Sequence, residues 1–439
     1  MDVEQRSIVF QPIAQLKPNP HNARTHDKRQ IRQIAESIRG FGFTNPVLVD
    51  TDNQIVAGHG RVEAAKLLGL TVVPTIRLDR LTKQQIRAYI IADNKLAERA
   101  GWDNEILAIE FEELLAMDPV EFEITITGFE MAEIDQILEE ASQANEIQDQ
   151  VPEPNFEEEA ITQPGDLWSL GKHKIFCGNA LHEGSYKMLM GAQRAAAVFA
   201  DPPYNVKIDG HATGNGVIRH REFLMASGEM SEAAFLSFLN DSLRLMAGYS
   251  AVDSIHYICM DWRHVGDLIS AGKQNYDQLL NLCVWVKDNG GMGSFYRSQH
   301  ELVVVFRRGK GRRRNNIQLG KFGRNRTNVW LYPGVQTLSK RSDEGNLLAL
   351  HPTVKPVAMV ADAILDCTAR GDIVLDAFLG SGTTLLAAER VGRACYAIEI
   401  DRHYVDLAIR RWQKYTGESG IHSATGKQFD EVASLRGLK

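Results

Sequence analysis

The sequence predicts a Rossmann-like α/β fold for the larger, C-terminal part of the chain and a smaller α+β domain before it. Near the C-terminus a strand, a glycine-rich loop, a helix and a second strand follow one another, at 372–376, 377–382, 383–390 and 394–399. Earlier, the apolar run 195–200 reads as a buried strand that ends directly in Asp201-Pro202-Pro203-Tyr204. The third observation is the distribution of charge.

Charge divides the chain into three parts. Residues 1–100 hold 15 Lys and Arg against 10 Asp and Glu, residues 101–160 hold 19 acids and no Lys or Arg, and residues 161–439 hold 34 against 27. The net charges of +5, −19 and +7 add up to the −7 of the whole chain. We therefore expect domains at 8–100 and 161–439, joined by an acidic helical connector and linker at 101–160.

Targeting signals and cysteines place the protein in the cytoplasm. No apolar run approaches the length of a membrane span, and the charged first twenty residues do not form a signal peptide. The five cysteines are never closer than 24 positions, which argues against a zinc knuckle or a disulfide framework. We expect a cytoplasmic protein, encoded by a bacterium or a phage, with no membrane partner and no metal.

The first domain contains a glycine turn between a strand and a helix. A hairpin at 46–57 leads into Gly58-His59-Gly60-Arg61, and the helix 62–68 follows. Backbone amides at such a turn can converge on an anion, with Arg61 beside them. The alternative is a tight strand-to-helix turn with a solvated Arg61.

The run from Gly58 to Gly69 resembles the phosphate-binding box of the ParB N-terminal, sulfiredoxin-like domain, and 43–49 also matches that family. The resemblance implies binding of a nucleoside triphosphate, with Gly58, His59, Gly60 and Arg61 as candidate phosphate ligands, and a part in engaging DNA. Sulfiredoxin chemistry would need a catalytic cysteine, and residues 1–100 contain none. We therefore exclude that activity.

The acidic segment predicts two amphipathic helices, with apolar residues at helical spacing over 106–115 and 131–138. Its second half loses apolar residues, and Pro152 to Glu159 reads as a solvated linker. The alternative is a DNA mimic that occupies a basic cleft.

The turn Asp201-Pro202-Pro203-Tyr204 is stiff, because each proline fixes its φ and donates no backbone N–H. A carboxylate, an outward carbonyl and an aromatic face can together hold an amino group on a flat ring. The alternative for these four residues alone is a plain Pro-Pro turn with a capping acid. Crevices at the carboxyl ends of strands are where open α/β sheets bind ligands, which favours the functional interpretation.

The glycine loop after the strand 372–376 predicts a nucleoside site. The third glycine of a dinucleotide fingerprint would fall at Leu385, so the sequence excludes an NAD oxidoreductase. Glu399, at the tip of the second strand, is placed to accept hydrogen bonds from both ribose hydroxyls.

Together, these segments resemble the amino-methyltransferases of DNA over nearly all of 161–439. His351 to Pro356 is similar to the family's lead-in helix motif, Asp376 to Thr384 to its S-adenosylmethionine loop, and 285–287 and 300–306 to its later strands. The turn at 201 precedes the loop at 380, which is the permuted order of the beta class. The implied cofactor ligands are Asn179, Thr353, Lys355, Asp376, Phe378, Gly380, Ser381, Gly382, Thr383 and Glu399. Asn179 stands where an aspartate is common.

The beta class places its target-recognition segment between the two motifs, here at 307–350. Residues 307–326 hold nine Lys and Arg and no acid, with glycine and asparagine between them. We expect a flexible basic loop that neutralises phosphates, and the alternative is a solvated loop. Base readout would come from Asn315, Asn316, Gln318 and Arg324. The candidate DNA-binding residues are Arg312, Arg313, Arg314, Arg324 and Arg326.

The resemblance implies methyl transfer from S-adenosylmethionine to the N6 amino group of adenine in double-stranded DNA. In the turn Asp201-Pro202-Pro203-Tyr204, the Asp201 carboxylate and the Pro202 carbonyl would accept hydrogen bonds from the amino group of a flipped base. Pro203 would keep the turn rigid, and Tyr204 would stack on the ring of the base. The alternatives are methylation of cytosine N4 and a non-catalytic ParB-like DNA-binding or nucleotide-switch protein. A nucleotide at the first domain and a second copy of the chain, as a homodimer, are further candidate partners.

Overall fold

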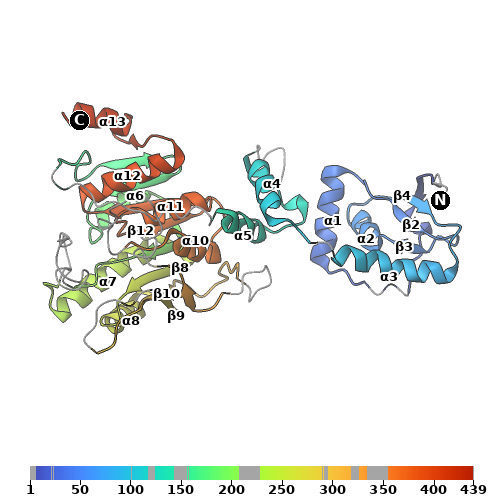
Figure 1. Cartoon of the computed structure of the whole chain (residues 1–439), viewed down its shortest axis with the longest axis horizontal. Coiled ribbons are helices and arrows are strands. Elements are labelled where there is room, and N and C mark those ends of the chain that lie inside the picture. Colours follow the sequence, from blue (N-terminus) through green and yellow to red (C-terminus); the bar gives the residue numbers. More distant parts are fainter. Residues whose placement is uncertain are drawn as a thin grey trace. The chain divides into compact units, whose positions relative to one another are not determined.

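The computed structural model describes residues 6–20, 22, 24–99, 101–116, 124–142, 156, 158–206, 228–288, 290, 295–317, 326–333 and 354–438. The chain forms two compact units, Met1–Ala141 and Ser142–Lys439 (Figure 1). The acidic helices that the sequence predicts over 106–115 and 131–138 fall within the first of these units. No helix in the described part of the chain is long and apolar enough to cross a membrane.

The N-terminal unit is an α+β structure, as the sequence predicts. Its elements are β1 (Val9–Pro12), η1 (Ile13–Gln15), α1 (Lys28–Phe41), β2 (Val47–Val49), β3 (Ile55–Ala57), α2 (His59–Leu67), β4 (Val72–Arg77), α3 (Lys83–Arg99), α4 (Asn104–Ala116), η2 (Ile124–Thr127) and α5 (Met131–Ser142). The four strands form one sheet in the order β1-β4-β2-β3. In this sheet β2 is parallel to β4, and the β1–β4 and β2–β3 pairs are antiparallel.

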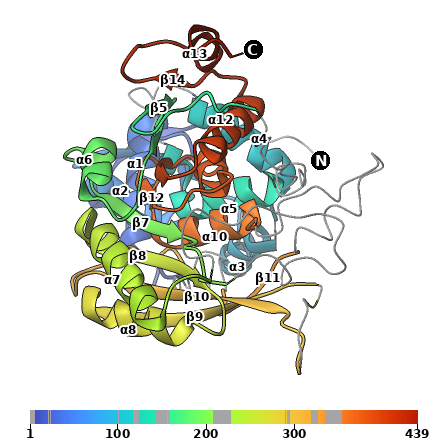
Figure 2. The same cartoon turned by 90° about the vertical axis from the view of Figure 1, so that its left-hand side faces the viewer.

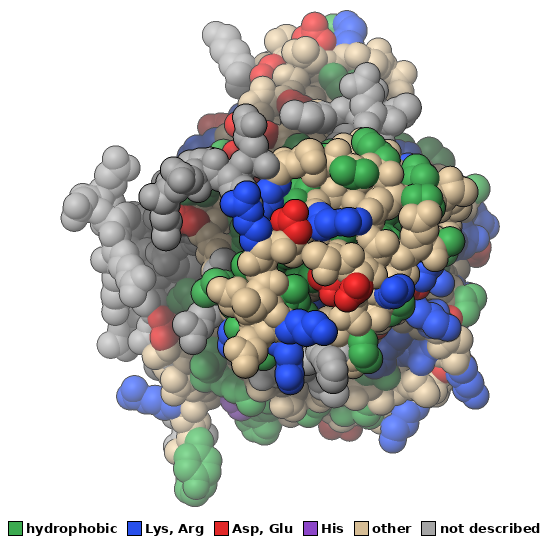
Figure 3. Space-filling view, turned by 90° about the vertical axis from the view of Figure 1, so that its right-hand side faces the viewer, with side chains coloured by type: hydrophobic (Ala, Val, Ile, Leu, Met, Phe, Trp, Pro, Cys, Tyr) green, Lys and Arg blue, Asp and Glu red, His purple; other side chains and the backbone are tan. Residues whose placement is uncertain are grey.

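Three small cores hold the described part of this unit together. One joins the sheet to α2 through side chains that include Val47, Val49 and Val62. A second joins β3 to α3, where Val56 and Ile90 are buried. The third lies within the acidic segment, where α4, η2 and α5 pack around a core that includes Phe111 and Ile134. Acidic side chains therefore cover a folded helical module. Over the face of the N-terminal unit shown in Figure 3, Lys and Arg side chains are spread out and do not gather into one stripe.

The C-terminal unit contains a ten-stranded mixed sheet. Its strands are β5 (Leu167–Leu170), β6 (His173–Cys177), β7 (Ala195–Ala200), β8 (Ser250–Met260), β9 (Gln278–Val286), β10 (His300–Arg307), β11 (Val329–Leu331), β12 (Ile373–Asp376), β13 (Ala394–Glu399) and β14 (Ile421–His422). Its helices are α6 (Glu183–Met190), α7 (Glu232–Gly248), α8 (Val265–Asn275), α10 (Val357–Cys367), α11 (Thr383–Arg390), α12 (Arg402–Thr416) and α13 (Phe429–Leu435). The strand order is β11-β9-β10-β8-β7-β12-β13-β6-β5-β14.

The helices lie in two layers, one on each face of this sheet. α6, α7 and α8 cover one face, and α10, α11 and α12 cover the other (Figure 2). The alternation of β7 fits this arrangement, because Ala197 and Phe199 enter one core while Val198 and Ala200 enter the other. A run that is apolar at every position is the pattern expected for a strand buried on both faces.

Between the two central strands, β7 and β12, the sheet grows in opposite directions. β7 and β12 are parallel neighbours. From β7 the chain passes through α7 to β8 on one side, and from β12 it passes through α11 to β13 on the other. Such a topological switch point opens a crevice at the carboxyl ends of the strands. We call this side of the sheet the catalytic edge.

Candidate active site

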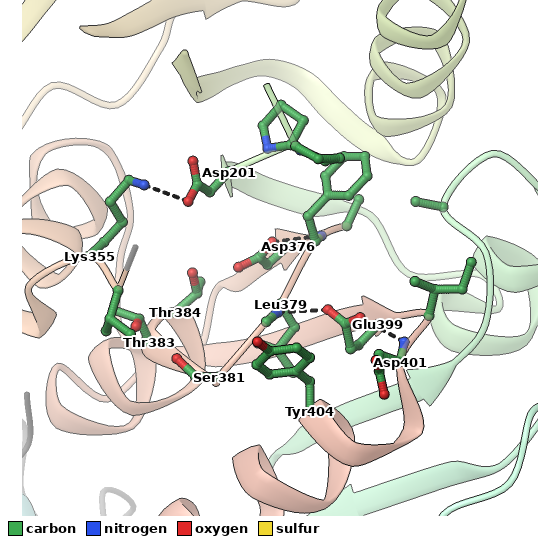
Figure 4. Close-up of a pocket in the computed structure, with 18 of the residues that line it drawn as sticks. Asp201, Lys355, Asp376, Leu379, Ser381, Thr383, Thr384, Glu399, Asp401 and Tyr404 are labelled. Atoms are coloured by element: carbon green, nitrogen blue, oxygen red, sulfur yellow. Dashed lines mark hydrogen bonds and ion pairs between the residues drawn. The ribbon is translucent and has the colours of Figure 1, made fainter. Parts of the chain in front are cut away.

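A pocket lies at the catalytic edge, where the sequence predicts it (Figure 4). Its walls come from the turn after β7, the loop between β12 and α11, the end of β13, and the segment before α10. The lining residues are Phe156, Gly178, Ala180, Phe199, Asp201, Pro202, Pro203, Tyr204, Glu301, Val354, Lys355, Val360, Asp376, Ala377, Phe378, Leu379, Gly380, Ser381, Thr383, Thr384, Glu399, Ile400, Asp401 and Tyr404. Two motifs about 180 residues apart in sequence thus share one cavity.

The turn after β7 presents Asp201 with both of its carboxylate oxygens in hydrogen bonds. Lys355 Nζ donates to Asp201 Oδ2 at 2.5 Å, and the Tyr204 hydroxyl donates to Oδ1 at 2.5 Å. The far end of the turn is fixed by Asn205, whose Oδ1 accepts the backbone N–H groups of Gly228 and Met230, each at 3.1 Å. The carboxylate is therefore held in one orientation.

Lys355, which the family resemblance places at the cofactor, lines the pocket and lies between two acids. Its buried Nζ is 2.5 Å from Asp201 Oδ2 and 3.0 Å from Glu301 Oε2. Lys287 Nζ contacts the other oxygen of Glu301 at 2.5 Å, and the Tyr204 hydroxyl lies 3.3 Å from Oε2. Two carboxylates and two ammonium groups thus alternate in a neutral chain, which we call the Asp201 network.

Charge and burial act on this network in opposite directions. Burial raises the pKa of Asp201 above its ordinary value, Lys355 opposes that rise, and the charge of Glu301 adds to it. Burial would also raise the pKa of Glu301, but Lys355 and Lys287 outweigh it and lower the value to about 2. Burial opposes the charged form of Lys355, whereas Asp201 and Glu301 raise its pKa. Lys355 therefore stays protonated and stabilises the ionised form of Asp201.

Sequence reasoning missed Glu301 and Lys287, although a signal was present. Glu301 is an acid at the start of the apolar strand β10, and Lys287 directly follows β9. β10 is antiparallel to β8, and β9 is antiparallel to β10, so the start of β10 and the end of β9 meet at the catalytic edge. Only the strand order shows that these charges reach Asp201. Phe156, Asp401 and Tyr404 also line the pocket without having been predicted.

The loop between β12 and α11 is tied to Glu399 by its backbone. The Gly380 N–H donates to Glu399 Oε2 and the Asp401 N–H donates to Oε1, both at 2.8 Å. Asp376 Oδ1 accepts the Phe378 N–H at 2.9 Å. Burial raises the pKa of both carboxyl groups, Asp376 and Glu399, to about 7.

These residues fit a nucleoside cofactor with a polar tail. Glu399 offers carboxylate oxygens, the acceptors that a ribose diol requires. Phe378, Leu379 and Tyr404 supply apolar and aromatic surface for a flat base. Ser381 and Thr383 add polar groups at the start of α11, where the helix also presents backbone amides.

Two of the predicted cofactor residues have other surroundings. Asn179 is not among the lining residues, and its Oδ1 accepts the Leu181 N–H at 2.8 Å, while the neighbouring Gly178 and Ala180 line the pocket. Gly382 is the N-cap of α11, and a Cβ built there would lie 2.9 Å from Ala408 Cβ. Gly382 thus allows α11 to pack closely against α12. Thr353 lies outside the described residues.

The basic segment lies away from the pocket. β10 begins at the catalytic edge and ends at Arg307, so Arg312, Arg313 and Arg314 follow the opposite edge of the sheet. Arg326 pairs with Asp362 at 2.8 Å and Asp366 at 3.2 Å on α10, where it stabilises the fold. Arg324 and Gln318 lie outside the described residues.

The glycine turn of the N-terminal unit is shorter than predicted, because α2 begins at His59 and includes Gly60 and Arg61 in its first turn. Gly58 is the N-cap of α2, and His59 Nε2 accepts the Asn19 N–H at 3.1 Å. Arg61 Nη1 donates to the backbone carbonyls of Asn45 at 2.6 Å and Pro46 at 3.0 Å. Part of the guanidinium is thus engaged by the protein itself.

Comparison with known proteins identifies each part of the chain. Residues 195–410 match the DNA methylase family of N6 and N4 methyltransferases, residues 1–94 match the ParB N-terminal domain, and residues 105–164 match the ParB-methyltransferase HTH domain. The acidic segment, which the sequence alone suggested as a connector, therefore corresponds to a helix-turn-helix domain.

The chain is also similar to a ParB-like protein and to two DNA methyltransferases. The ParB-like nuclease domain-containing protein YnaK of Escherichia coli (strain K12) is 51% identical over 82 residues, which are 19% of this chain and 94% of that protein. The type II methyltransferase M.ScaI of Streptomyces caespitosus is 36% identical over 100 residues, 23% of this chain and 32% of that protein. The type II methyltransferase M2.MboI of Moraxella bovis is 25% identical over 226 residues, 50% of this chain and 81% of that protein.

The fold, the permuted order of its motifs and the pocket define an S-adenosylmethionine-dependent DNA methyltransferase. Residues 195–410 belong to the N6/N4 family of DNA methylases, and this methyltransferase part is joined to a ParB N-terminal domain at residues 1–94.

Proposed function

We propose that the protein methylates the exocyclic N6 amino group of adenine in double-stranded DNA. The observation that carries the proposal is Asp201, an acid at the first position of the turn, whose ionised form is stabilised by Lys355. Within the family resemblance, an acid at this position usually goes with adenine and a serine usually goes with cytosine. An anion is also the stronger acceptor for an amino proton.

The amino group of a base is a poor nucleophile, because its lone pair is delocalised into the ring. Asp201 and the Pro202 carbonyl both lie in the pocket wall, where they can accept hydrogen bonds from the two N–H groups of the amino group. These hydrogen bonds would draw the nitrogen toward a tetrahedral, nucleophilic form. S-adenosylmethionine supplies the electrophilic methyl group. Glu399, Phe378 and Ser381 would hold this cofactor, and Asp201 would take the proton that the nitrogen loses. Most of the rate would come from positioning and fixed charges.

The test is to incubate the purified protein with DNA and labelled cofactor, and to separate the nucleosides afterwards. Label in methylated deoxyadenosine is the expected result. Label in methylated deoxycytidine would overturn adenine in favour of cytosine N4. The absence of transfer, together with intact DNA binding, would favour a DNA-binding protein without methyltransferase activity.

We further propose that the turn from Gly58 to Arg61 binds the phosphates of a nucleotide. The support is the N-terminus of α2, which presents backbone amides beside the Arg61 guanidinium. Equilibrium binding of a nucleoside triphosphate to the full chain tests this proposal, and Arg61→Gln should weaken the binding.

A further inference from the structure

The hairpin of β9 and β10 starts from the Asp201 network. Lys287 and Glu301, which contact each other at 2.5 Å, stand at its base on the catalytic edge. The pairing continues for one more step, because the Lys287 N–H donates to the Gln299 carbonyl at 2.9 Å and Gln299 Nε2 donates to the Lys287 carbonyl at 2.8 Å. The described residues beyond this pair, Gly290 and 295–298, therefore continue past the catalytic edge.

Two aromatic side chains near the tip are exposed. Phe295 is 87% exposed and Tyr296 is 82% exposed, the highest values among the large hydrophobic residues in the described part of the chain. Their ring centroids are 4.6 Å apart at an interplanar angle of 72°, so each ring supports the other. The arms of the tip also pack closely, since a Cβ at Gly290 would lie 3.3 Å from Arg297 Cβ. Exposed apolar groups of this size indicate an interaction surface.

The chemistry around these rings favours nucleic acid. Arg297 directly follows Tyr296, and at the same edge Trp262 follows β8 with 55% exposure. The Arg263 guanidinium lies 4.9 Å from the Trp262 ring centroid. Arginines beside exposed aromatic rings can neutralise phosphates while the rings stack on bases or enter between them.

The position of the hairpin distinguishes it from the basic loop. Phe295 is six residues from Glu301, so the two Cα atoms are at most roughly 20 Å apart. Arg312 lies beyond the other end of β10, whose eight residues span roughly 23 Å. Asn316 fixes that loop to the C-terminal end of α10, through hydrogen bonds to the carbonyls of Leu365 at 2.7 Å and Thr368 at 2.8 Å. A duplex with its target base at Asp201 would therefore meet the hairpin first.

We propose that Phe295 and Tyr296 form an aromatic wedge, which enters the duplex beside the target base and fills the space that the base leaves when it turns into the Asp201 pocket. This inference rests on the proposed methylation of duplex DNA. A base that leaves the stack loses its pairing and stacking, and aromatic rings in its place restore part of the stacking. The wedge lowers the cost of flipping and takes no part in methyl transfer itself.

The test compares two duplexes that contain the sequence modified by the wild-type protein. In one duplex the target base is paired, and in the other it stands opposite an abasic site, where flipping costs less. The double variant Phe295→Ala/Tyr296→Ala should lose on the order of 10²-fold in kcat/KM on the paired duplex, because stacking on each ring is worth about tenfold or more. On the abasic duplex it should stay within about threefold of the wild type.

A second readout follows the flip without chemistry. With 2-aminopurine at the target position, the wild type should raise the fluorescence of the paired duplex and the double variant should not. The matched control is Met188→Ala/Leu435→Ala, which removes two exposed apolar side chains on α6 and α13 and should keep the fluorescence rise. Phe295→Leu/Tyr296→Phe should keep most of the activity. Equal losses on both duplexes, or no loss on either, would overturn the wedge. A wild-type protein that flips 2-aminopurine but transfers no methyl group would contradict the proposed function and support the wedge.

Discussion

Two turns of nearly the same backbone shape lie in the two units of the chain. In the N-terminal unit, β3 leads through Gly58 (φ 104°, ψ 23°) into α2, and in the C-terminal unit β12 leads through a loop ending at Gly382 (φ 93°, ψ 25°) into α11. Both glycines are left-handed N-caps, and both helices present free backbone amides at that end. The neighbouring side chains differ, because Arg61 lies beside Gly58 whereas Glu399 binds the Gly380 N–H.

The difference teaches that a strand-glycine-helix turn does not by itself define a ligand. The helix N-terminus favours negative charge in both units. Arg61 adds a positive charge and favours an anion. The carboxylate of Glu399 repels phosphate and accepts hydrogen bonds from hydroxyl groups. The charge of a neighbouring side chain thus favours an anion at one turn and hydroxyl groups at the other.

The largest expected effect is the loss of methyl transfer on changing Asp201, which lies in the C-terminal unit. Asp201→Ala should reduce methyl transfer by roughly 10²- to 10⁴-fold, because the amino group loses its charged acceptor. Cofactor binding, measured by calorimetry, should stay near the wild-type value, since Glu399 and its loop are unchanged. Asp241→Ala, at an exposed position on α7, is the matched control. Methyl transfer above a few per cent of wild type in Asp201→Ala would contradict the role of this acid.

The next effect compares the two glycines directly. Gly382→Ala places a methyl group 2.9 Å from Ala408 Cβ and 3.2 Å from its Cα, and it strains a left-handed residue. We expect a loss of about 2–4 kcal/mol in unfolding free energy. In Gly58→Ala the nearest atom is Arg61 Nε at 3.2 Å, the far end of a flexible side chain, so the loss should be about 1–2 kcal/mol. Urea unfolding curves check both values, and equal losses would show that α12 does not restrict the second turn.

The affinity for S-adenosylmethionine tests whether Glu399 binds the ribose hydroxyls of the cofactor. Glu399→Gln keeps the size of the side chain but removes the charge that would accept the ribose hydroxyls. Hydrogen bonds to a charged group are worth about 1.5–3 kcal/mol, so affinity for S-adenosylmethionine should fall roughly 10- to 100-fold. Glu418→Gln, an exposed glutamate after α12, is the control. Unchanged affinity in Glu399→Gln would place the ribose elsewhere.

The pH dependence of cofactor binding follows from the same residue. Burial raises the pKa of Glu399 to about 7, and ribose hydroxyls bind its ionised form. Bound cofactor therefore lowers this pKa, and affinity should fall as pH drops through about 7, by about tenfold between pH 8 and pH 6. Calorimetry in buffers of different ionisation enthalpy should detect proton release below pH 7. Glu399→Gln should flatten the profile, and a slope kept by that variant would assign the proton to Asp376 instead.

Sequence predicted best what depends on neighbours along the chain. The apolar run of β7, the glycine loop after β12 and the acid at the tip of β13 are local patterns, and the structure brings all three to one pocket. The contact between Lys355 and Asp201 joins residues 154 positions apart. It depends on strand order and on the direction of α10, which no local pattern contains.

Charge patterns misled where burial decides. Arg326 belongs to a basic run in the sequence, but the structure pairs it with two acids of α10. In the acidic segment the apolar spacing predicted better than the charge, because α4 and α5 form where two amphipathic helices are expected and bury Phe111 and Ile134 in a core of their own. A run of like charges leaves open what the apolar face of each helix packs against, and it does not show that every charged side chain faces water, because Asp135 and Glu139 on α5 are buried.

The smallest expected effect is that of Arg61→Gln. It tests whether Arg61 binds a ligand, as proposed for Glu399, or only stabilises the turn at Gly58. Its two hydrogen bonds to the Asn45 and Pro46 carbonyls are made in the structure itself, so Arg61→Gln should lower the unfolding free energy by about 1 kcal/mol without any ligand. Lys66→Gln, on the same helix, should change it less, because Lys66 pairs only with the exposed Glu63. A nucleoside triphosphate should raise the melting temperature of the wild type and not of Arg61→Gln, because the phosphate would use the remaining guanidinium donors. If Arg61→Gln lost nucleotide binding at full stability, the carbonyl contacts would be dispensable, and the turn would serve the ligand alone.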